Sequence, residues 1–152
     1  MHSRCFVLSR DKNSTDYTDA DDLPYLFSQV EYAQEVSDWA DSINWVFDSS
    51  IEEIDESEGY QLTNKDVDNL FMSVKDIVKV SYERSLPELE KLRKWLSSDN
   101  AKPEEKIHIW RLNDLCDYPI LFIVDGNTVE GLELLNSVEP GMWVKQIFDY
   151  HF

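Results

Sequence analysis

The feature that most constrains this chain is a long stretch of one-signed charge in its first half. Residues 13–64 contain 14 aspartates and glutamates and neither a lysine nor an arginine. The densest part is residues 48–59, DSSIEEIDESEG, where six of the twelve side chains are carboxylates. Because burying an unpaired carboxylate is strongly unfavourable, any fold of this chain must keep most of these side chains at its surface.

The acidity belongs to a folded body rather than to a disordered tail. The chain has 152 residues, enough for one domain with a real core, and it is 42% hydrophobic and 12% aromatic. Disordered acidic segments are poor in aromatic residues. The net charge of −17 therefore lies on a globular surface. Such a field attracts basic partners and disfavours direct binding to nucleic acid or to an anionic membrane.

The sequence predicts a cytoplasmic protein with reduced thiols. Two cysteines, Cys5 and Cys116, do not make a disulfide framework. No apolar run approaches the roughly 18 residues of a membrane span. The first ten residues, MHSRCFVLSR, lack the apolar core and the cleavage site of a signal peptide.

In the first half of the chain, hydrophobic periodicity predicts one strand and two helices. Residues 5–8 are an apolar strand, 11–22 a surface loop, and 23–27 a short helix with proline in its first turn. Residues 31–47 have apolar side chains on one helical face and acids on the other. Residues 48–59 are expected to form either a short helical turn or an anchored loop.

In the second half, Thr63 is expected to cap a helix whose core stripe runs from Val67 to Tyr82. A third helix is predicted over residues 86–96, after a break or kink at Pro87. Asn127 and Glu130 form a predicted capping box for a short helix that reaches Leu135. Strands are predicted at residues 106–112, 119–124 and 142–148, with a connection at 97–105 and a turn at 140–141.

Together these elements predict an α+β fold in a single domain, 1–152, with an acidic helical region at 13–64. Three or four helices would pack on a small mixed or antiparallel sheet. The sheet would be formed largely by the C-terminal third of the chain together with an N-terminal strand. The last residues, QIFDYHF, could instead be an exposed docking peptide, but a final strand is the favoured interpretation.

The candidate binding site is the acidic surface of residues 31–58. Acids three or four residues apart on a helix lie about 5–6 Å apart, a spacing comparable with that of charges along a nucleic-acid backbone. A row of carboxylates could thus occupy the Lys and Arg sites that a nucleic-acid-binding protein uses for phosphates. A merely solvated acidic face is the open alternative. The predicted partner-binding residues are Glu31, Glu35, Asp38, Asp41, Trp45, Asp48, Glu52, Glu53, Asp55, Glu56 and Glu58.

Trp45 is an exception to the apolar face of the predicted helix. Helical geometry places it among the acids, and an exposed tryptophan inside an acidic rim has the composition of an interface anchor. If the helix ends early or rotates, Trp45 is buried in the core instead. Burial is the favoured alternative.

Metal binding and catalysis have weaker support. Asp11, Asn13, Thr15 and Asp22 occupy ligand positions of an EF-hand-like loop, but Asp16 stands where glycine is needed. We therefore predict no metal and no other cofactor.

We also predict no enzyme activity. No phosphate-binding loop, nucleophile elbow or zinc-protease motif occurs. His108 is expected on a sheet surface, and His2 and His151 lie near the chain ends. Cys116 lies between Asp114 and Asp117, whose charges would disfavour a thiolate.

The composition is similar to that of small acidic inhibitors from bacteria and phages, such as immunity proteins against nuclease toxins and anti-defence proteins that imitate nucleic acid. This is a likeness of composition and not of residues. It implies a stoichiometric inhibitor of a basic nuclease or defence effector, with a slight preference for a phage anti-CRISPR or anti-restriction role. The alternatives are an acidic adaptor or structural protein that binds through an apolar surface, and a small hydrolase.

Overall fold

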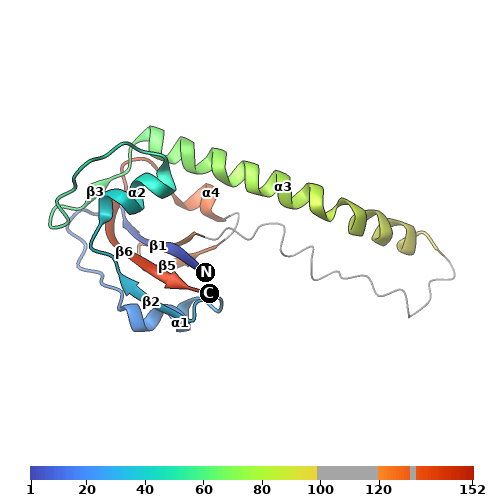
Figure 1. The fold of residues 1–152 in the computed structure, drawn as a ribbon, viewed down its shortest axis with the longest axis horizontal. Coiled ribbons are helices and arrows are strands. Elements are labelled where there is room, and N and C mark those ends of the chain that lie inside the picture. The colour runs from blue at the N-terminus through green and yellow to red at the C-terminus, as the bar shows by residue number, and fades with distance from the viewer. Residues whose placement is uncertain (99–119, 131–132) are drawn as a thin grey trace. The chain divides into compact units, whose positions relative to one another are not determined.

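The computed structural model describes residues 1–98, 120–130 and 133–152, which form an α+β fold as predicted (Figure 1). The chain divides into two compact units. The first comprises residues 1–72 and 118–152, and the second comprises residues 73–117. That the chain is one domain therefore stays a prediction. The elements are β1 (His2–Ser9), the 3-10 helix η1 (Ala20–Asp22), α1 (Leu23–Leu26), β2 (Tyr32–Glu35), α2 (Trp39–Phe47), β3 (Tyr60–Gln61), α3 (Asn64–Leu96), β4 (Leu121–Val124), β5 (Asn127–Val129), α4 (Leu134–Ser137) and β6 (Trp143–His151).

A mixed sheet organises the first unit. Its strand order is β2-β6-β1-β4-β5, and β3 pairs with another part of β6. β1 runs parallel to β4, whereas β6 is antiparallel to β1, β2 and β3. The prediction of a mixed sheet built from an N-terminal strand and the C-terminal third is thus confirmed. The sequence did not indicate that β2 and β3, from within the acidic region, extend it.

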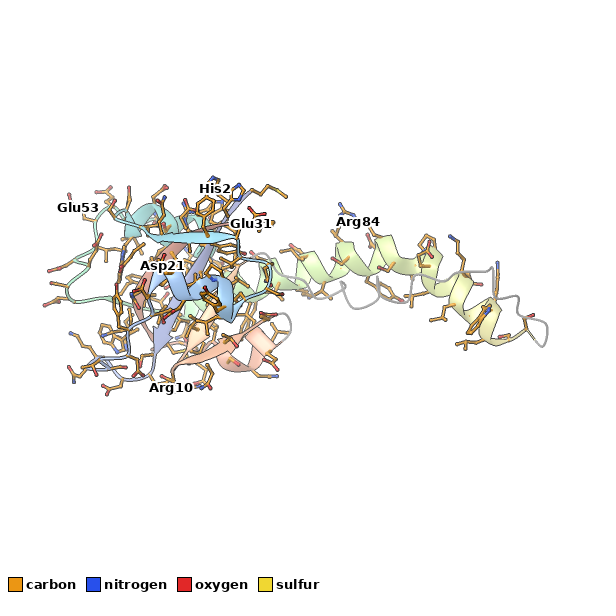
Figure 2. The ribbon with its side chains drawn as sticks, turned by 90° about the horizontal axis from the view of Figure 1, so that it is seen from below. His2, Arg10, Asp21, Glu31, Glu53 and Arg84 are labelled. Carbon is orange, nitrogen blue, oxygen red and sulfur yellow. The ribbon has the colours of Figure 1, made fainter. Side chains whose placement is uncertain are left out.

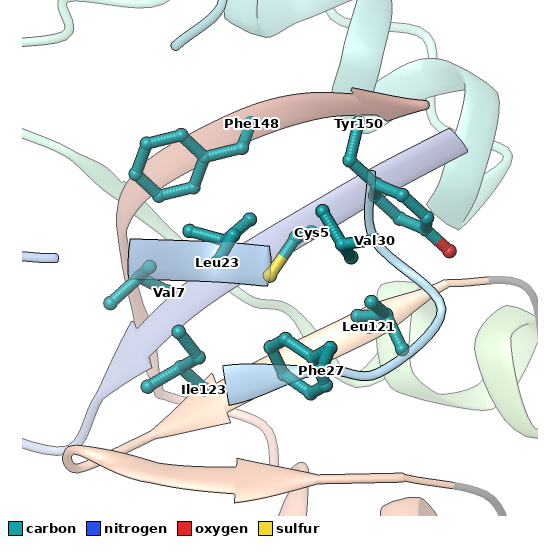
Figure 3. Packing of buried hydrophobic residues seen from close by; sticks show 9 residues of the cluster. All are labelled: Cys5, Val7, Leu23, Phe27, Val30, Leu121, Ile123, Phe148 and Tyr150. Carbon is teal, nitrogen blue, oxygen red and sulfur yellow. The ribbon is translucent and has the colours of Figure 1, made fainter. Parts of the chain in front are cut away.

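Alternation along β1 divides the core between the two faces of the sheet. Cys5 and Val7 lie on one face, in a buried cluster with Leu23 and Phe27 from the α1 segment (Figure 3). On the other face Phe6 makes an edge-on contact with Phe47 of α2, with ring centroids 5.3 Å apart. Helical segments therefore cover both faces of the sheet, and Figure 1 shows α1 and α2 on opposite sides of it.

The predicted helix at residues 31–47 is wrong in its first half. Tyr32–Glu35 is strand β2, paired with the end of β6, and the N–H of Val36 donates to the carbonyl of Ile147 at 2.9 Å. The helix begins only at Trp39, because the carboxylate of Asp38 accepts the N–H of Asp41 at 3.1 Å and caps it. The local sequence is compatible with a helix, but pairing with the buried strand β6 makes these residues a strand. The region 13–64 is consequently not mainly helical.

α3 begins as predicted and continues further than predicted. The hydroxyl of Thr63 accepts the N–H of Asp66 at 3.2 Å, and the Asp66 carboxylate accepts the N–H of Thr63 at 2.8 Å, which is a reciprocal cap. The helix then passes through Pro87 to Leu96, so the predicted separate third helix is wrong. A proline removes one backbone hydrogen bond, and the i,i+3 ion pair between Lys91 and Glu88 is among the contacts that favour helix beyond it.

The predicted capping box at Asn127 is also wrong, because Asn127–Val129 is strand β5. Asp125 and Gly126 have φ angles of 48° and 79° and form the two-residue turn between β4 and β5. Such a turn requires left-handed backbone at both central residues, and Asp-Gly is a strong signal for it. A helix, α4, starts only at Leu134.

The C-terminal residues form the predicted final strand and not a free docking peptide, since β6 pairs with β1 as far as the pair His2 and His151. The strands at residues 5–8, 119–124 and 142–148 and the short helix at 23–27 are confirmed, within one to three residues at their ends. The predicted strand at 106–112, most of the connection at 97–105, and both His108 and Cys116 lie outside the described residues. In the part of the chain that is described, no helix is long and apolar enough to cross a membrane.

Candidate functional site: an acidic band

All fourteen carboxylates of residues 13–64 are exposed, including the ten carboxylates among the predicted partner-binding residues. We call this set the acidic band. None of them forms an ion pair with a lysine or arginine that the structure describes, and the ion pair described for Glu31 is with a histidine, His151, at 3.2 Å. The members are Asp16, Asp19, Asp21, Asp22, Glu31, Glu35, Asp38, Asp41, Asp48, Glu52, Glu53, Asp55, Glu56 and Glu58.

The band does not form the single helical row that the sequence predicted. Its first four acids lie beside η1 and α1, Glu31 and Glu35 flank the edge strand β2, and the others follow on α2 and the loop after it. Figure 2 shows Glu53 well separated from Glu31 and Asp21. The band thus bends around the β2 edge, from one face of the sheet to the other. The aspartates of residues 16–22 belong to it, although the sequence had not indicated them as site residues.

The loop that carries the densest acids is anchored, as one of the two predictions for it stated. The side-chain amide of Asn44 donates to the carbonyl of Ile51 at 2.7 Å and accepts its N–H at 2.9 Å. Within the loop, Asp55 accepts the hydroxyl of Ser57 at 2.6 Å and its N–H at 3.0 Å. These bonds from Ser57 lower the pKa of the Asp55 carboxyl. The loop therefore holds its exposed glutamates on an ordered backbone.

One carboxylate just beyond the band has a different role. Asp66 is buried, and its carboxylate accepts hydrogen bonds from the hydroxyls of Ser49, Tyr60 and Thr63 and from the N–H of Thr63. Burial by itself raises the pKa of Asp66, but these donors outweigh it and the pKa is lowered. Asp66 thereby ties both ends of the acidic loop to the start of α3.

Trp45 is exposed, with 58% of its surface accessible, so its favoured burial is wrong. The helix continues through Phe47, and Trp39, Ile43 and Phe47 fill its buried face, which leaves Trp45 on the outer face. Asp41, four residues before it, lies on the same face, and Asp48, the residue just after the end of the helix, is also exposed.

The Trp45 ring makes a cation–π contact with Arg4. The guanidinium carbon of Arg4 lies 5.7 Å from the ring centroid. Arg4 is fixed in turn by Asp149, at 2.9 Å, and by the hydroxyl of Ser42, at 3.2 Å. His2, Arg4, Asp41 and Trp45 line a shallow cavity of about 230 Å³. The outer face of α2 therefore presents a positioned aromatic ring beside carboxylates.

The other chemistries weighed from the sequence gain no support from the geometry. Asp11 accepts the N–H of Asn13 at 2.9 Å and so forms a local turn. Among the described residues, no three His, Cys, Asp or Glu side chains are grouped in a way that could hold a metal ion. Cys5 is buried, and burial raises the pKa of its thiol, which keeps it protonated at neutral pH.

Comparison with known proteins adds no relative to this description. No model of a protein family matches the chain, and neither does any curated protein or solved structure. The class defined by fold and surface is therefore an α+β protein with an exposed acidic band around one edge of its sheet.

Proposed function

We propose that this protein is an acidic inhibitor that binds the basic nucleic-acid-binding surface of a nuclease or of another nucleic-acid-binding defence effector. The observation that supports this most is the exposure of all fourteen carboxylates of the band, with no lysine or arginine partner among the described residues. Crowded like charges destabilise the compact state, and a basic partner would relieve that repulsion.

The shape of the band supports a groove as its target. A band that bends around a sheet edge is convex, and a convex acidic edge fits a positively charged groove of the kind that tracks a nucleic-acid strand. Imitation of phosphates by evenly spaced acids on one helix is not part of the proposal, because the predicted helical row does not exist. Recognition depends instead on charge and on the outline of the edge.

Binding would occur in two stages. The field of the band attracts a basic partner over a distance and raises the association rate, in a manner that salt suppresses. Contacts around an aromatic anchor then slow dissociation. Trp45 fits the second role because it is exposed and Arg4 holds it in place.

The test is affinity capture from a bacterial lysate with elution along a salt gradient, using two variants of equal charge. In the band variant Glu52, Glu53 and Glu56 become glutamine. In the control variant Asp68 and Asp76 become asparagine and Glu83 becomes glutamine; these three are exposed on α3. We expect a nucleic-acid-binding protein that competes with DNA or RNA. The band variant should lose it at lower salt than the control variant does.

One observation favours the alternative, an adaptor that binds through an apolar surface. α3 exposes several large apolar side chains, among them Val80, Tyr82, Leu86 and Leu96. A partner that stays bound at high salt and is retained equally by both variants would favour the adaptor over the inhibitor. Capture of many basic proteins that all leave at low salt would contradict the inhibitor and move the adaptor to first place, because it would make the band a non-specific polyanion.

A further inference from the structure

A second cavity lies on the face of the sheet opposite α2, beside η1 and α1. It is an open cleft of about 430 Å³, within the range of about 300–1,000 Å³ typical of ligand sites. Its floor is formed by the paired residues Ile123 of β4 and Thr128 of β5, with Gly126 from the turn between these strands. Its other lining residues are Asp16, Tyr17, Thr18, Asp22, Tyr25 and Leu26.

The wall of this cleft is fastened to the sheet. Gln146 of β6 is buried, and its side-chain amide accepts the N–H of Thr18 at 2.9 Å and donates to the carbonyl of Thr18 at 3.0 Å. Further along, Leu23 at the start of α1 and Phe27 just after its end are fully buried. The segment between these anchor points therefore has a defined position on the sheet.

Fixing the segment in this way turns two tyrosines outward. Tyr25 is 89% exposed and Tyr17 is 70% exposed, which are high values for large aromatic side chains. The charge of Glu35 on the neighbouring β2 edge, with a hydrogen bond to the same carboxylate, raises the pKa of the Tyr17 hydroxyl. The Tyr17 hydroxyl is therefore protonated at neutral pH.

The charge of the cleft is negative. Asp16 and Asp22 are both exposed lining residues, and the described lining residues include no lysine, arginine or histidine. The nearest basic residue in the sequence is Lys12, whose ammonium nitrogen lies 4.8 Å from the ring centroid of Trp143, which is not a lining residue. A ligand for this cleft must therefore bring the positive charge itself.

We propose that this cleft binds an arginine side chain presented by a segment of the basic protein partner. The guanidinium group would lie against a tyrosine ring and pair with Asp16 or Asp22, while its methylene stem would cover Leu26 and Ile123. Arginine suits this site better than lysine, because its flat group both stacks on aromatic rings and pairs with carboxylates. The inference rests on the proposed function only for the identity of the partner as a basic protein.

The experiment uses the full chain and three blocked peptides that differ at one position, which is arginine, lysine or the neutral isostere citrulline. Binding is followed by NMR titration of backbone amides. We expect the arginine peptide to bind most tightly and the citrulline peptide least, with shifts concentrated at residues 16–18, 22–26 and 126–128.

Two variants and a matched control locate the binding. Replacing Asp16 and Asp22 with asparagine should weaken binding of the arginine peptide by about tenfold, which is within the range expected for two exposed charge contacts. Tyr25→Ala should also weaken it and should leave the fold intact, because Tyr25 is almost wholly exposed. The control replaces Asp21 and Asp68 with asparagine; both are exposed and outside the cleft lining. It should bind the arginine peptide as tightly as the unaltered protein does.

Shifts spread over the whole band, or equal losses in the cleft variant and the control, would overturn the proposal. So would equal affinity for the arginine and citrulline peptides. If the peptide binds in the cleft but no nucleic-acid-binding protein is captured, the cleft proposal stands and the proposed function fails. If such a protein is captured and the cleft variant binds it and the peptide unchanged, the cleft proposal alone fails.

Discussion

Carboxylate side chains are exposed in the acidic band but buried and hydrogen-bonded at the start of α3. In the band, the carboxylates face solvent without a described lysine or arginine partner. At the start of α3, Asp66 is buried and accepts hydrogen bonds from three residues. Asp125 and Asp149 resemble Asp66, since Arg10 and Arg4 respectively contact them. The difference teaches that donors nearby, and not the residue type, decide whether an acid stabilises this fold or is left for a partner.

The largest effect should come from removing the buried carboxylate. Asp66→Ala leaves the hydroxyls of Ser49, Tyr60 and Thr63 without their acceptor and removes a cap of α3, so we expect it to lower the free energy of unfolding by about 3 kcal/mol. Urea denaturation measures this. Asp68→Ala, exposed two residues further along the same helix, should change stability by less than about 0.5 kcal/mol. Equal effects would mean that the hydrogen bonds of Asp66 contribute little.

The next effect concerns binding and not stability. Trp45→Ala should weaken binding of the captured partner by about 2 kcal/mol, which is the size typical of an aromatic hot spot. It should lower the free energy of unfolding by less than about 1 kcal/mol, because the ring is largely exposed and its described contact is with Arg4. Calorimetric titration and denaturation measure the two. Trp45→Phe keeps a ring for Arg4 and should recover part of the affinity; if both variants bind normally, Trp45 is not an anchor.

Salt should distinguish the two kinds of acid. Raising the ionic strength from about 10 mM to about 150 mM screens exposed charges and should stabilise the protein by about 1 kcal/mol through reduced repulsion within the band. The variant with Glu52, Glu53 and Glu56 changed to glutamine should gain less from salt than the α3 control of equal charge. Thermal unfolding at several salt concentrations measures this. An equal salt-induced stabilisation of the two variants would show that the band contributes no more to the repulsion than the acids of α3 do.

The smallest effect is a dependence on pH at the β4–β5 turn. The N–H and the guanidinium of Arg10, with the hydroxyl of Ser9, lower the pKa of Asp125 below its ordinary value of 3.8. A lowered pKa means that the stabilisation is complete above about pH 3.8 and is lost as the pH falls through the folded value. Asp125→Asn, which tolerates the positive φ, should cost up to about 1 kcal/mol at neutral pH, since the site is partly exposed.

Acid denaturation curves measure this last prediction. The stability difference between the unaltered protein and Asp125→Asn should be constant above the ordinary carboxyl pKa and should shrink below it. A difference that does not depend on pH would show that the Asp125 charge contributes nothing and that only the shape of the turn matters.

Several elements could be predicted because their signals are local. The apolar runs of β1, β4 and β6, the proline at the start of α1, and the Thr63 cap of α3 each specify structure within a few residues. The exposure of the acids could be predicted too, because it follows from solvation and does not require knowledge of the fold.

The errors share a different cause. Residues 32–35 form a strand because the end of β6 is available to pair with them, and helical spacing within residues 31–47 concealed this. Trp45 is outside because α2 neither ends before it nor rotates, so Trp39, Ile43 and Phe47 keep the buried face. The Asp-Gly turn carried a hairpin signal that a competing capping-box pattern obscured. In each case the sequence offered two local interpretations; a distant strand decided the first, and the local geometry of the turn decided the last.

By itself, then, the sequence determined that this is an α+β protein with a charged, one-signed surface, because charge and hydrophobic pattern act through solvation at each position. Only the tertiary structure decided that the band bends around the β2 edge, that Arg4 lies over the ring of Trp45, and that residues 16–26 enclose a cleft with β4 and β5. These three features join segments that are far apart in the chain. Strand pairing and core packing bring such segments together, and no short stretch of sequence contains that information.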